Sequence, residues 1–278
     1  SEQLPSLPDS DPTRNNTTSQ TASEEKVGNA KKLDQLKELL PADISDEGAV
    51  ILEPAAGGVH TALKAKIQSG DVVVVQGSGT MGLCSIAAIR QLTNAETIIA
   101  SAKYPLQRIL AEEFGADIVV GPSELKRAVR QVTGCRMIGN SLSGGSDVTI
   151  DAVGNASSIK TSLDITRPRG RVVMLGMPGV TKVDLTPLWH REIEMVGSYT
   201  YGTEELSNGE TTSSYELAFD LVREKKLEKL TVDAMKVCPD GKEFNPLTKR
   251  CNKKCKTGLL QYNILNHIEI FLLYCSQN

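Results

Sequence analysis

The sequence predicts an α/β protein built on a doubly wound, six-stranded parallel sheet. Two observations carry this prediction. An apolar, β-branched run at Val72–Val75 breaks directly into a glycine-rich turn, and apolar residues then recur at helical spacing from Met81 to Leu92. Beyond Ser101, strand-like and helix-like patterns alternate with little interruption as far as Lys226.

The turn after the first strand has the pattern Gly-x-Gly-x-x-Gly over Gly77–Gly82. Gly77 permits a tight turn, Gly79 lets the backbone approach a pyrophosphate, and Gly82 lets helix and strand pack closely. Flexible loops produce this pattern by chance, but here a strand precedes it, a helix follows it, and Thr97–Ser101 closes a βαβ unit. The pattern therefore predicts a dinucleotide site in which the helix N-terminus faces the phosphates. The candidate contacts in the turn are Gly77, Ser78, Gly79, Thr80, Met81 and Gly82.

The elements before this strand are less regular. Residues 1–31 are mostly polar, so ordering them would cost entropy without burying apolar surface, and we expect disorder there. Residues 32–40 form a possible short helix that Pro41 ends. Residues 46–54 lead into a predicted helix at 57–64, just ahead of the glycine strand.

The elements after Ser101 follow a regular order. Helices are expected near residues 105–114, 123–132, 157–166 and 213–226, and strands at residues 117–120, 147–153, 171–176 and 192–198. Under the right-handed crossover rule, the six strands form a doubly wound Rossmann sheet.

The chain therefore divides into three parts. Residues 1–45 form a disordered leader, residues 46–232 the Rossmann dinucleotide-binding domain, and residues 233–278 an irregular, cysteine-rich tail. The tail cysteines, together with His267, offer zinc ligands, but their spacing fits common finger patterns poorly, and reduced thiols are favoured. The cysteines in question are Cys238, Cys251, Cys255 and Cys275.

Composition narrows the possible partners. The chain has 278 residues, a net charge of −3 and 40% hydrophobic residues, as expected for a globular protein. This charge gives no electrostatic reason to expect nucleic acid or an anionic membrane surface as a partner, so small molecules are favoured. Residues 1–35 lack the apolar core of a secretory signal, and no stretch is long enough to span a bilayer, so we expect a cytoplasmic protein.

A series of short motifs occurs along the central region, in the order Glu53-Pro54, Gly58-Val59-His60, Gly77–Leu83, Glu113–Asp117, Asp151–Gly154, Gly170–Gly176 and Glu192–Gly202. In these motifs the region resembles the medium-chain, zinc-type alcohol dehydrogenase and quinone reductase family. The resemblance covers about Asp46 to Leu230 and corresponds to the family's cofactor-binding domain.

The resemblance also shows which family features are missing from this sequence. In the family, a catalytic domain that lies mostly before the Rossmann domain supplies the catalytic zinc ligands. Here no cysteine precedes Cys84 and no histidine precedes His60, and the four cysteines of the structural zinc lobe are absent. Glu53 matches a position at the catalytic zinc of polyol dehydrogenases, but a single carboxylate cannot hold zinc, so a solvated or helix-capping role is favoured. We therefore expect no catalytic residues and no metal site in what resembles a Rossmann core without its catalytic partner. The tail pieces around Cys238 and Cys251 resemble a short element of large DNA virus proteins, which carries no transferable activity.

The cofactor is predicted to be NADP in preference to NAD. NAD-specific domains place an acid at the end of the second strand, to hydrogen-bond the adenosine ribose. Here that position falls on Ser101 or Ala102, with Lys103 and Arg108 close by. A small or hydroxyl residue followed by lysine suits a 2′-phosphate better, although both cations are also explained as ordinary surface charges.

The nicotinamide end is expected to meet the loops after the fourth and fifth strands, at the carboxyl edge of the sheet. The contacting residues would be Ala152, Val153 and Gly154, followed by Leu175, Gly176 and Met177. Cys84 and Cys135 are interpreted as small core residues, and His190 as a surface histidine.

Three functions remain open. The first is a nucleotide-binding module that is truncated, fused or decayed, and the second is an active zinc-type oxidoreductase on an alcohol, polyol or ketone, or half of a split enzyme. The third is an interaction protein that docks through its tail. The residues present in the sequence favour the first function, the nucleotide-binding module. The resemblance further implies a homodimer that pairs through the sixth strand.

Overall fold

The computed structural model describes residues 43–206, 209–225, 227–230, 243–245 and 250–252. The expected disorder before residue 32, the helix at residues 32–40 and the side chains of the tail cysteines lie outside the described residues. The described residues from Ser45 to Asn252 belong to one unit in the division of the chain by contacts. No helix among the described residues combines the length and hydrophobicity needed to cross a membrane.

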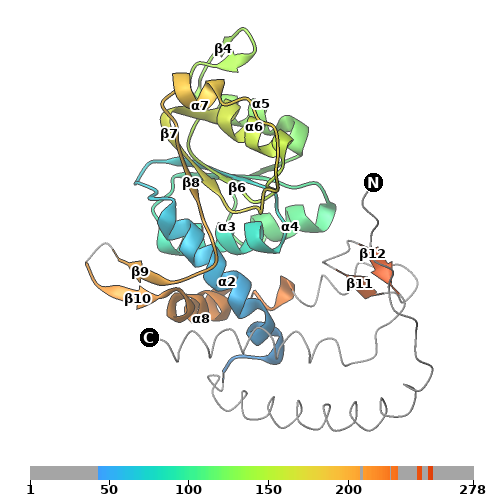
Figure 1. Ribbon diagram of the computed structural model, residues 1–278. Coiled ribbons are helices and arrows are strands. Elements are labelled where there is room, and N and C mark those ends of the chain that lie inside the picture. Colours follow the sequence, from blue (N-terminus) through green and yellow to red (C-terminus); the bar gives the residue numbers. More distant parts are fainter. Residues whose placement is uncertain (1–42, 207–208, 226, 231–242, 246–249, 253–278) are drawn as a thin grey trace, which may run out of the picture. The chain divides into compact units, whose positions relative to one another are not determined.

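The centre of the domain is a six-stranded parallel sheet, as predicted (Figure 1). Its strands lie in the order β3-β2-β1-β6-β7-β8, so the chain winds outward from β1 in both directions. The strands are β1 (Val72–Gln76), β2 (Thr97–Ser101), β3 (Ile118–Val120), β6 (Ser146–Asp151), β7 (Thr166–Met174) and β8 (Glu194–Gly197).

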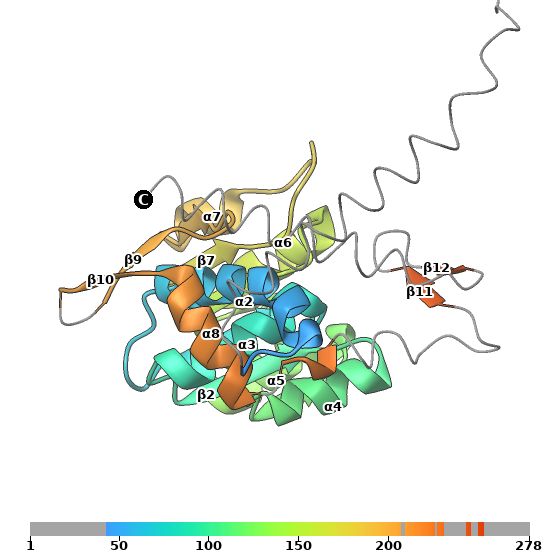
Figure 2. The ribbon, with the colours of Figure 1, turned by 90° about the horizontal axis from the view of Figure 1, so that it is seen from below.

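Helices cover both faces of this sheet (Figures 1 and 2). On one face lie α2 (Asp46–Lys64), α3 (Thr80–Leu92), α4 (Pro105–Glu113) and α8 (Ser214–Lys225). On the other lie α5 (Leu125–Thr133), which follows the 3₁₀ turn η1 (Pro122–Glu124), α6 (Ala156–Ile165) and the short α7 (Thr186–His190).

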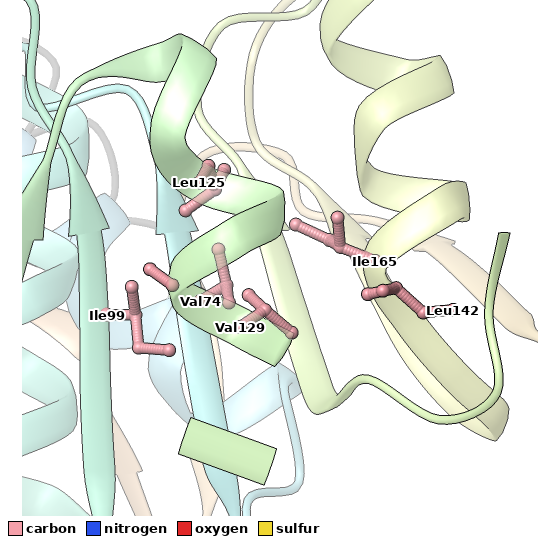
Figure 3. Close-up of a cluster of buried hydrophobic side chains, with 7 residues drawn as sticks. Val74, Ile99, Leu125, Val129, Leu142 and Ile165 are labelled. Atoms are coloured by element: carbon pink, nitrogen blue, oxygen red, sulfur yellow. The ribbon is translucent and has the colours of Figure 1, made fainter. Parts of the chain in front are cut away.

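The core between sheet and helices is built from the β-branched strand residues. Val74 of β1 and Ile99 of β2 are fully buried against Leu125 and Val129 of α5 (Figure 3). Val73 and Val75, which alternate with Val74, are also fully buried. Burial on both faces explains why the valine run shows no polar alternation.

Helix α2 differs from the sequence prediction, because it begins at Asp46 and runs through Pro54 without ending. Ser45 caps its start, with the Gly48 N–H donating to Ser45 Oγ at 3.0 Å. Pro54 removes one backbone donor, but Ile51 and Leu52 are only 4% and 3% exposed, and their packing offsets that loss. Further along, a Cβ on Gly58 would lie 2.7 Å from the Cys84 carbonyl carbon, so glycine permits α2 to pack closely on α3.

Several short elements were not expected from the sequence. Strands of two or three residues have no readable period, and their pairing depends on the turn between them. They form three antiparallel pairs: β4 (Met137–Ile138) with β5 (Ser141–Leu142), β9 (Thr203–Glu205) with β10 (Thr211–Ser213), and β11 (Glu243–Asn245) with β12 (Arg250–Asn252).

Candidate nucleotide-binding site

The predicted cofactor contacts lie at one edge of the sheet. The last residues of four strands are register partners, since Gln76 pairs with both Ser101 and Asp151, and Asp151 pairs with Met174. The loops that follow these strands are therefore neighbours at the carboxyl edge, where parallel sheets bind ligands.

The glycine turn between β1 and α3 has the geometry that its spacing predicts. Gly77 has a φ of +96°, and a Cβ there would lie 2.5 Å from Val153 Cγ2. Gly82 is buried, and a Cβ on it would lie 1.9 Å from the carbonyl oxygen of Gly77. Only glycine permits this backbone contact between the turn and the first turn of the helix.

Gly79 differs from the other two glycines because the space beside it is open. A Cβ at this position would meet no described atom within 4 Å. Gly79 is the N-cap of α3, where it provides no side-chain hydrogen bond, and the first turn of α3 has no acidic residue. The N–H groups at this end, with the positive end of the helix dipole, can therefore accept an anionic group.

Ser101, at the end of β2, lies beneath the glycine turn. It is only 2% exposed. The Gly77 N–H is 3.3 Å from Ser101 Oγ, and Ser78 Oγ donates to the Ser101 carbonyl oxygen at 3.0 Å. The structure thus gives the Ser101 hydroxyl a contact with the turn itself, which the sequence did not reveal.

Two cations stand near this end of β2. Lys103 is exposed, and its Nζ lies 5.5 Å from the centre of the Tyr104 ring. Arg108 is half-buried in α4, and its Nη2 would lie 3.2 Å from a Cβ on Gly121, in the loop after β3. No acidic residue occurs between Thr97 and Arg108.

The loops after β6 and β7 are held together by Asp151, which the sequence analysis quoted in a motif but did not assign to the site. Asp151 is fully buried, and its Oδ1 accepts the N–H groups of Val153 at 2.9 Å and Gly154 at 3.1 Å. Its carbonyl oxygen accepts the N–H groups of Leu175 and Gly176 at 3.0 and 2.7 Å. The sequence signal for this role is an acid at the end of a strand, two and three residues before the backbone N–H groups that it binds.

Gly154 and Gly176 bring these two loops into backbone contact. Gly154 has a φ of +72°, and a Cβ there would lie 2.7 Å from the carbonyl carbon of Gly176. A Cβ on Gly176 would lie 2.4 Å from the Gly154 nitrogen. The side chains on either side are exposed, with Val153 44% and Met177 91% accessible. The two loops thus present apolar side chains at the carboxyl edge beside the glycine turn.

His60 of α2 is bound to a carboxylate from a distant part of the chain. Its Nδ1 lies 2.8 Å from Glu204 Oε1, and Ser214 Oγ donates to the same oxygen at 2.5 Å. Burial by itself would raise the pKa of Glu204, but hydrogen bonds from His60 and Ser214 and the charges of His60 and Lys64 together hold it below its usual value. The network joins α2 to the β9–β10 hairpin and to α8.

The remaining candidate residues do not form a reactive site. Burial, and secondarily the charge of Glu53, raises the pKa of the fully buried Cys84 thiol far above its usual value, which disfavours the thiolate. Cys135 is half-buried, and the exposed His190 lies within hydrogen-bond distance of the Thr186 carbonyl oxygen, 2.8 Å away. Within the described ranges, no three His, Cys, Asp or Glu side chains are grouped so that they could hold a metal ion.

A cavity of about 160 Å³ lies at the opposite edge of the sheet, where the strands begin. Its walls carry two ion pairs, Arg167 with Asp147 and Arg171 with Glu194, each at 2.6 Å. These charges neutralise one another and tie neighbouring strands, so we assign the cavity a structural role.

Comparison with known proteins identifies relatives of this domain. The family model described as zinc-binding dehydrogenase matches residues 80–213. Probable D-xylulose reductase A of Aspergillus clavatus is 32% identical over 190 residues, which are 68% of this chain and 49% of the relative. L-idonate 5-dehydrogenase (NAD(P)(+)) of Escherichia coli K12 is 29% identical over 165 residues, which are 59% of this chain and 45% of the relative.

A solved structure supports the fold independently. The crystal structure of L-idonate 5-dehydrogenase from Escherichia coli K-12 matches with a TM-score of 0.54 and 24% identity, over 71% of this chain and 56% of that chain. The chain spans about half the length of the curated relatives it matches. The residues that the family model matches run from the last part of the glycine turn through β2, β3, β6, β7 and β8. Together with the polyol dehydrogenase relatives, this match supports a medium-chain, zinc-type alcohol dehydrogenase family for the domain.

Proposed function

We propose that the domain binds a nicotinamide dinucleotide along the carboxyl edge of the sheet. In this arrangement Gly77–Gly82 and the start of α3 receive the pyrophosphate, and the end of β2 receives the adenosine. The loops after β6 and β7 receive the nicotinamide. The observation that carries the proposal is the open approach at Gly79 to a helix N-terminus without a side-chain cap or a first-turn acid.

We further propose that NADP is bound in preference to NAD. Ser101 is covered by the glycine turn, so the residues available to an adenosine 2′-substituent are Lys103 and Arg108. Both residues are cations. They can form charge-assisted hydrogen bonds with the 2′-phosphate of NADP, whereas the 2′-hydroxyl of NAD carries no charge for such bonds. The absence of an acid from Thr97 to Arg108 removes the usual acceptor for the free ribose.

The reaction class is proposed from the relatives. Their names are those of enzymes that act on D-xylulose and L-idonate, so polyol–ketone oxidoreduction is the activity we propose for a protein with this domain. The bound cofactor supplies the hydride chemistry, while the residues of this chain bind and orient it.

Glu53, which matches the family's metal position, and His60 in the same helix supply at most two ligands for zinc, and the described residues contain no group of three His, Cys, Asp or Glu side chains that could hold a metal ion. Glu53 and His60 are seven residues apart in α2, so their backbones are separated by about 10 Å along the helix axis. Zinc requires ligand atoms at about 2 Å from the metal. The His60 ring nitrogen Nδ1 is already 2.8 Å from Glu204. We therefore propose a nucleotide-binding role for the described domain without a metal-dependent step in it.

Calorimetric titration of the full chain with NADPH and NADH tests both parts of the proposal. We expect NADPH to bind more tightly. Lys103→Glu should weaken NADPH binding by about tenfold or more, because it removes one charge-assisted hydrogen bond and adds a repulsive charge. Gly79→Val should abolish binding of both cofactors, because its side chain would occupy the open approach.

Lys182→Glu is the matched control, because it makes the same charge change at an exposed lysine in the segment after β7. It should leave both affinities unchanged. Tighter binding of NADH than of NADPH would overturn the NADP assignment, whereas failure of both cofactors to bind would overturn the site itself.

A further inference from the structure

The segment from Leu125 to Ser143, which covers α5 and the β4–β5 hairpin, is strongly basic although the whole chain carries a net charge of −3. It contains four cationic residues and no Asp or Glu. The cationic residues are Lys126, Arg127, Arg130 and Arg136.

Three of these cations differ from most other arginines of the domain, which are neutralised by carboxylates. The paired arginines are Arg90, Arg167, Arg169, Arg171 and Arg223. Among the described residues, no carboxylate lies within ion-pair distance of Arg127, Arg130 or Arg136. All three are exposed. Their positive field therefore acts on whatever lies outside this face.

The geometry of α5 directs the basic side outward. Leu125 and Val129 pack into the core beneath the helix (Figure 3). Arg127 and Arg130 are exposed and three residues apart, so they are neighbours on the helix surface. Lys126 Nζ donates to the carbonyl oxygen of Asn140 in the hairpin turn, which keeps the turn beside the first turn of α5.

The hairpin presents an apolar tip next to these cations. Met137 and Ile138 are 42% and 67% exposed, whereas Leu142 on the partner strand is 3% exposed and belongs to the core. The buried Arg191 holds the base of the hairpin, with its Nη2 donating to the carbonyl oxygens of Leu142 at 2.7 Å and Gly144 at 2.8 Å. In Figure 1 the strand β4 projects from the end of the domain beyond α5 and α7.

We propose that this surface docks on a membrane that contains anionic lipid headgroups, with the hairpin tip entering the interfacial layer. We call it the α5–hairpin face, and it consists of Lys126, Arg127, Arg130, Arg136, Met137 and Ile138. Basic side chains attract the headgroups, and aliphatic side chains at a projecting tip bury themselves at the boundary with the acyl chains.

The chemistry of the face favours lipid over other anionic partners. The segment 125–143 has no aromatic residue, so it lacks the stacking platforms with which proteins hold single-stranded nucleic acid. An acidic protein would have to supply a pocket shaped for the projecting tip, whereas a bilayer interface receives such a tip without a preformed shape.

Cosedimentation of the full chain with vesicles tests the proposal. Vesicles of phosphatidylcholine with phosphatidylserine should bind the protein, vesicles of phosphatidylcholine alone should not, and high salt should weaken binding. The double variant Arg127→Glu/Arg130→Glu should lower the affinity by about tenfold or more. Ile138→Asp should also weaken binding, and Ile138→Leu should retain it.

Two matched controls make the same changes elsewhere on the surface. Lys182→Glu reverses an exposed charge, and Val180→Asp alters a fully exposed aliphatic residue in the segment after β7. Both should bind the vesicles as the parent does, and circular dichroism should show that every variant is folded. Equal binding to both vesicle types, no binding to either, or unchanged binding by the Arg127→Glu/Arg130→Glu variant would overturn the proposal. Polyglutamate or a single-stranded oligonucleotide could also displace the protein from the vesicles. If the Ile138→Asp substitution did not change that displacement, the partner would be an acidic macromolecule, and the proposal would be overturned.

Discussion

Asp151 is the residue that holds together the loops after β6 and β7, which we propose to receive the nicotinamide. It is fully buried and accepts hydrogen bonds from the backbone of its own loop and, at Oδ2, from Ser158 Oγ at 2.8 Å. The contact joins the loop after β6 to the first turn of α6.

Asp151→Asn should therefore destabilise the domain by about 1–3 kcal/mol, because one acceptor for these donors is replaced by a donor. It should also weaken cofactor binding. Urea unfolding and calorimetric titration would measure the two effects. Asp220→Asn, at an exposed site beside Arg223, is the control and should change stability by less than about 0.5 kcal/mol. Equal effects of both substitutions would contradict the role given to Asp151.

Glu204 gives the domain a predicted pH dependence. Its pKa is below the usual value of 4.5 because the bonds and charges of His60, Ser214 and Lys64 outweigh the effect of burial. A lowered folded-state pKa means that the carboxylate stabilises the fold above the usual pKa, and that this contribution is lost as pH falls through the folded-state pKa.

Glu204→Gln should accordingly be less stable than the parent at neutral pH, by about 1–3 kcal/mol, since a charge-assisted hydrogen bond is lost. The difference between the two proteins should shrink as the pH is lowered through the acidic range. Urea unfolding at a series of pH values checks this. A difference that stays constant into strongly acidic solution would show that Glu204 is not the titrating group.

Among the elements, β8 is one of the two edge strands of the sheet within the described residues, and β3 is the other. The Ser198 N–H donates to Met174 O at 2.9 Å, so by strand alternation the Gly197 N–H points away from β7. Backbone N–H groups that point outward from an edge strand can pair with the same strand of a second copy. We therefore predict that the protein self-associates through β8.

Gly197→Pro should reduce self-association, because it removes an outward donor and leaves the bonds to β7 in place. Gly197→Ala is the control, since a Cβ there meets no described atom within 4 Å and the N–H is retained. Sedimentation velocity over a range of concentrations separates the outcomes. A parent protein that is monomeric at high concentration, or equal association of both variants, would rule out pairing through this edge.

At the scale of the whole molecule, the family membership raises the question of zinc. The His60 imidazole is held by Glu204, and Glu53 lies nearly two turns away on the same helix, so this pair should contribute nothing to metal binding. Elemental analysis of the full chain should therefore give the same zinc content for the parent and for the Glu53→Gln/His60→Ala variant. A loss of stoichiometric zinc in that variant would contradict the prediction.

The net charge of the whole chain does not reveal the local charge of the α5–hairpin face. A net charge of −3 gives no reason to expect an anionic partner, yet the segment 125–143 carries four cations without an acid. The net charge does not show this local excess of cations, because the acidic residues that balance them lie elsewhere in the chain. Only the arrangement of α5 and its hairpin shows that three of those arginines remain unneutralised by described carboxylates.

The sequence by itself determined the parallel sheet and the glycine turn. Val72–Val75 and Gly77–Gly82 specify local conformation, since burial on both faces and backbone freedom act over a few residues and leave a readable pattern. The helices α3, α4, α5, α6 and α8 followed for the same reason, with bounds within two residues of those expected, whereas the five-residue helix α7 (Thr186–His190) was not expected.

Tertiary structure alone decided the features that join residues distant in the chain. The His60–Glu204 contact spans 144 positions, and the Ser101–Ser78 contact depends on β2 lying beside β1. The continuation of α2 through Pro54 rests on the packing of Ile51 and Leu52 against the folded domain. Such contacts leave no local period, because their energy comes from groups that only the completed fold brings together.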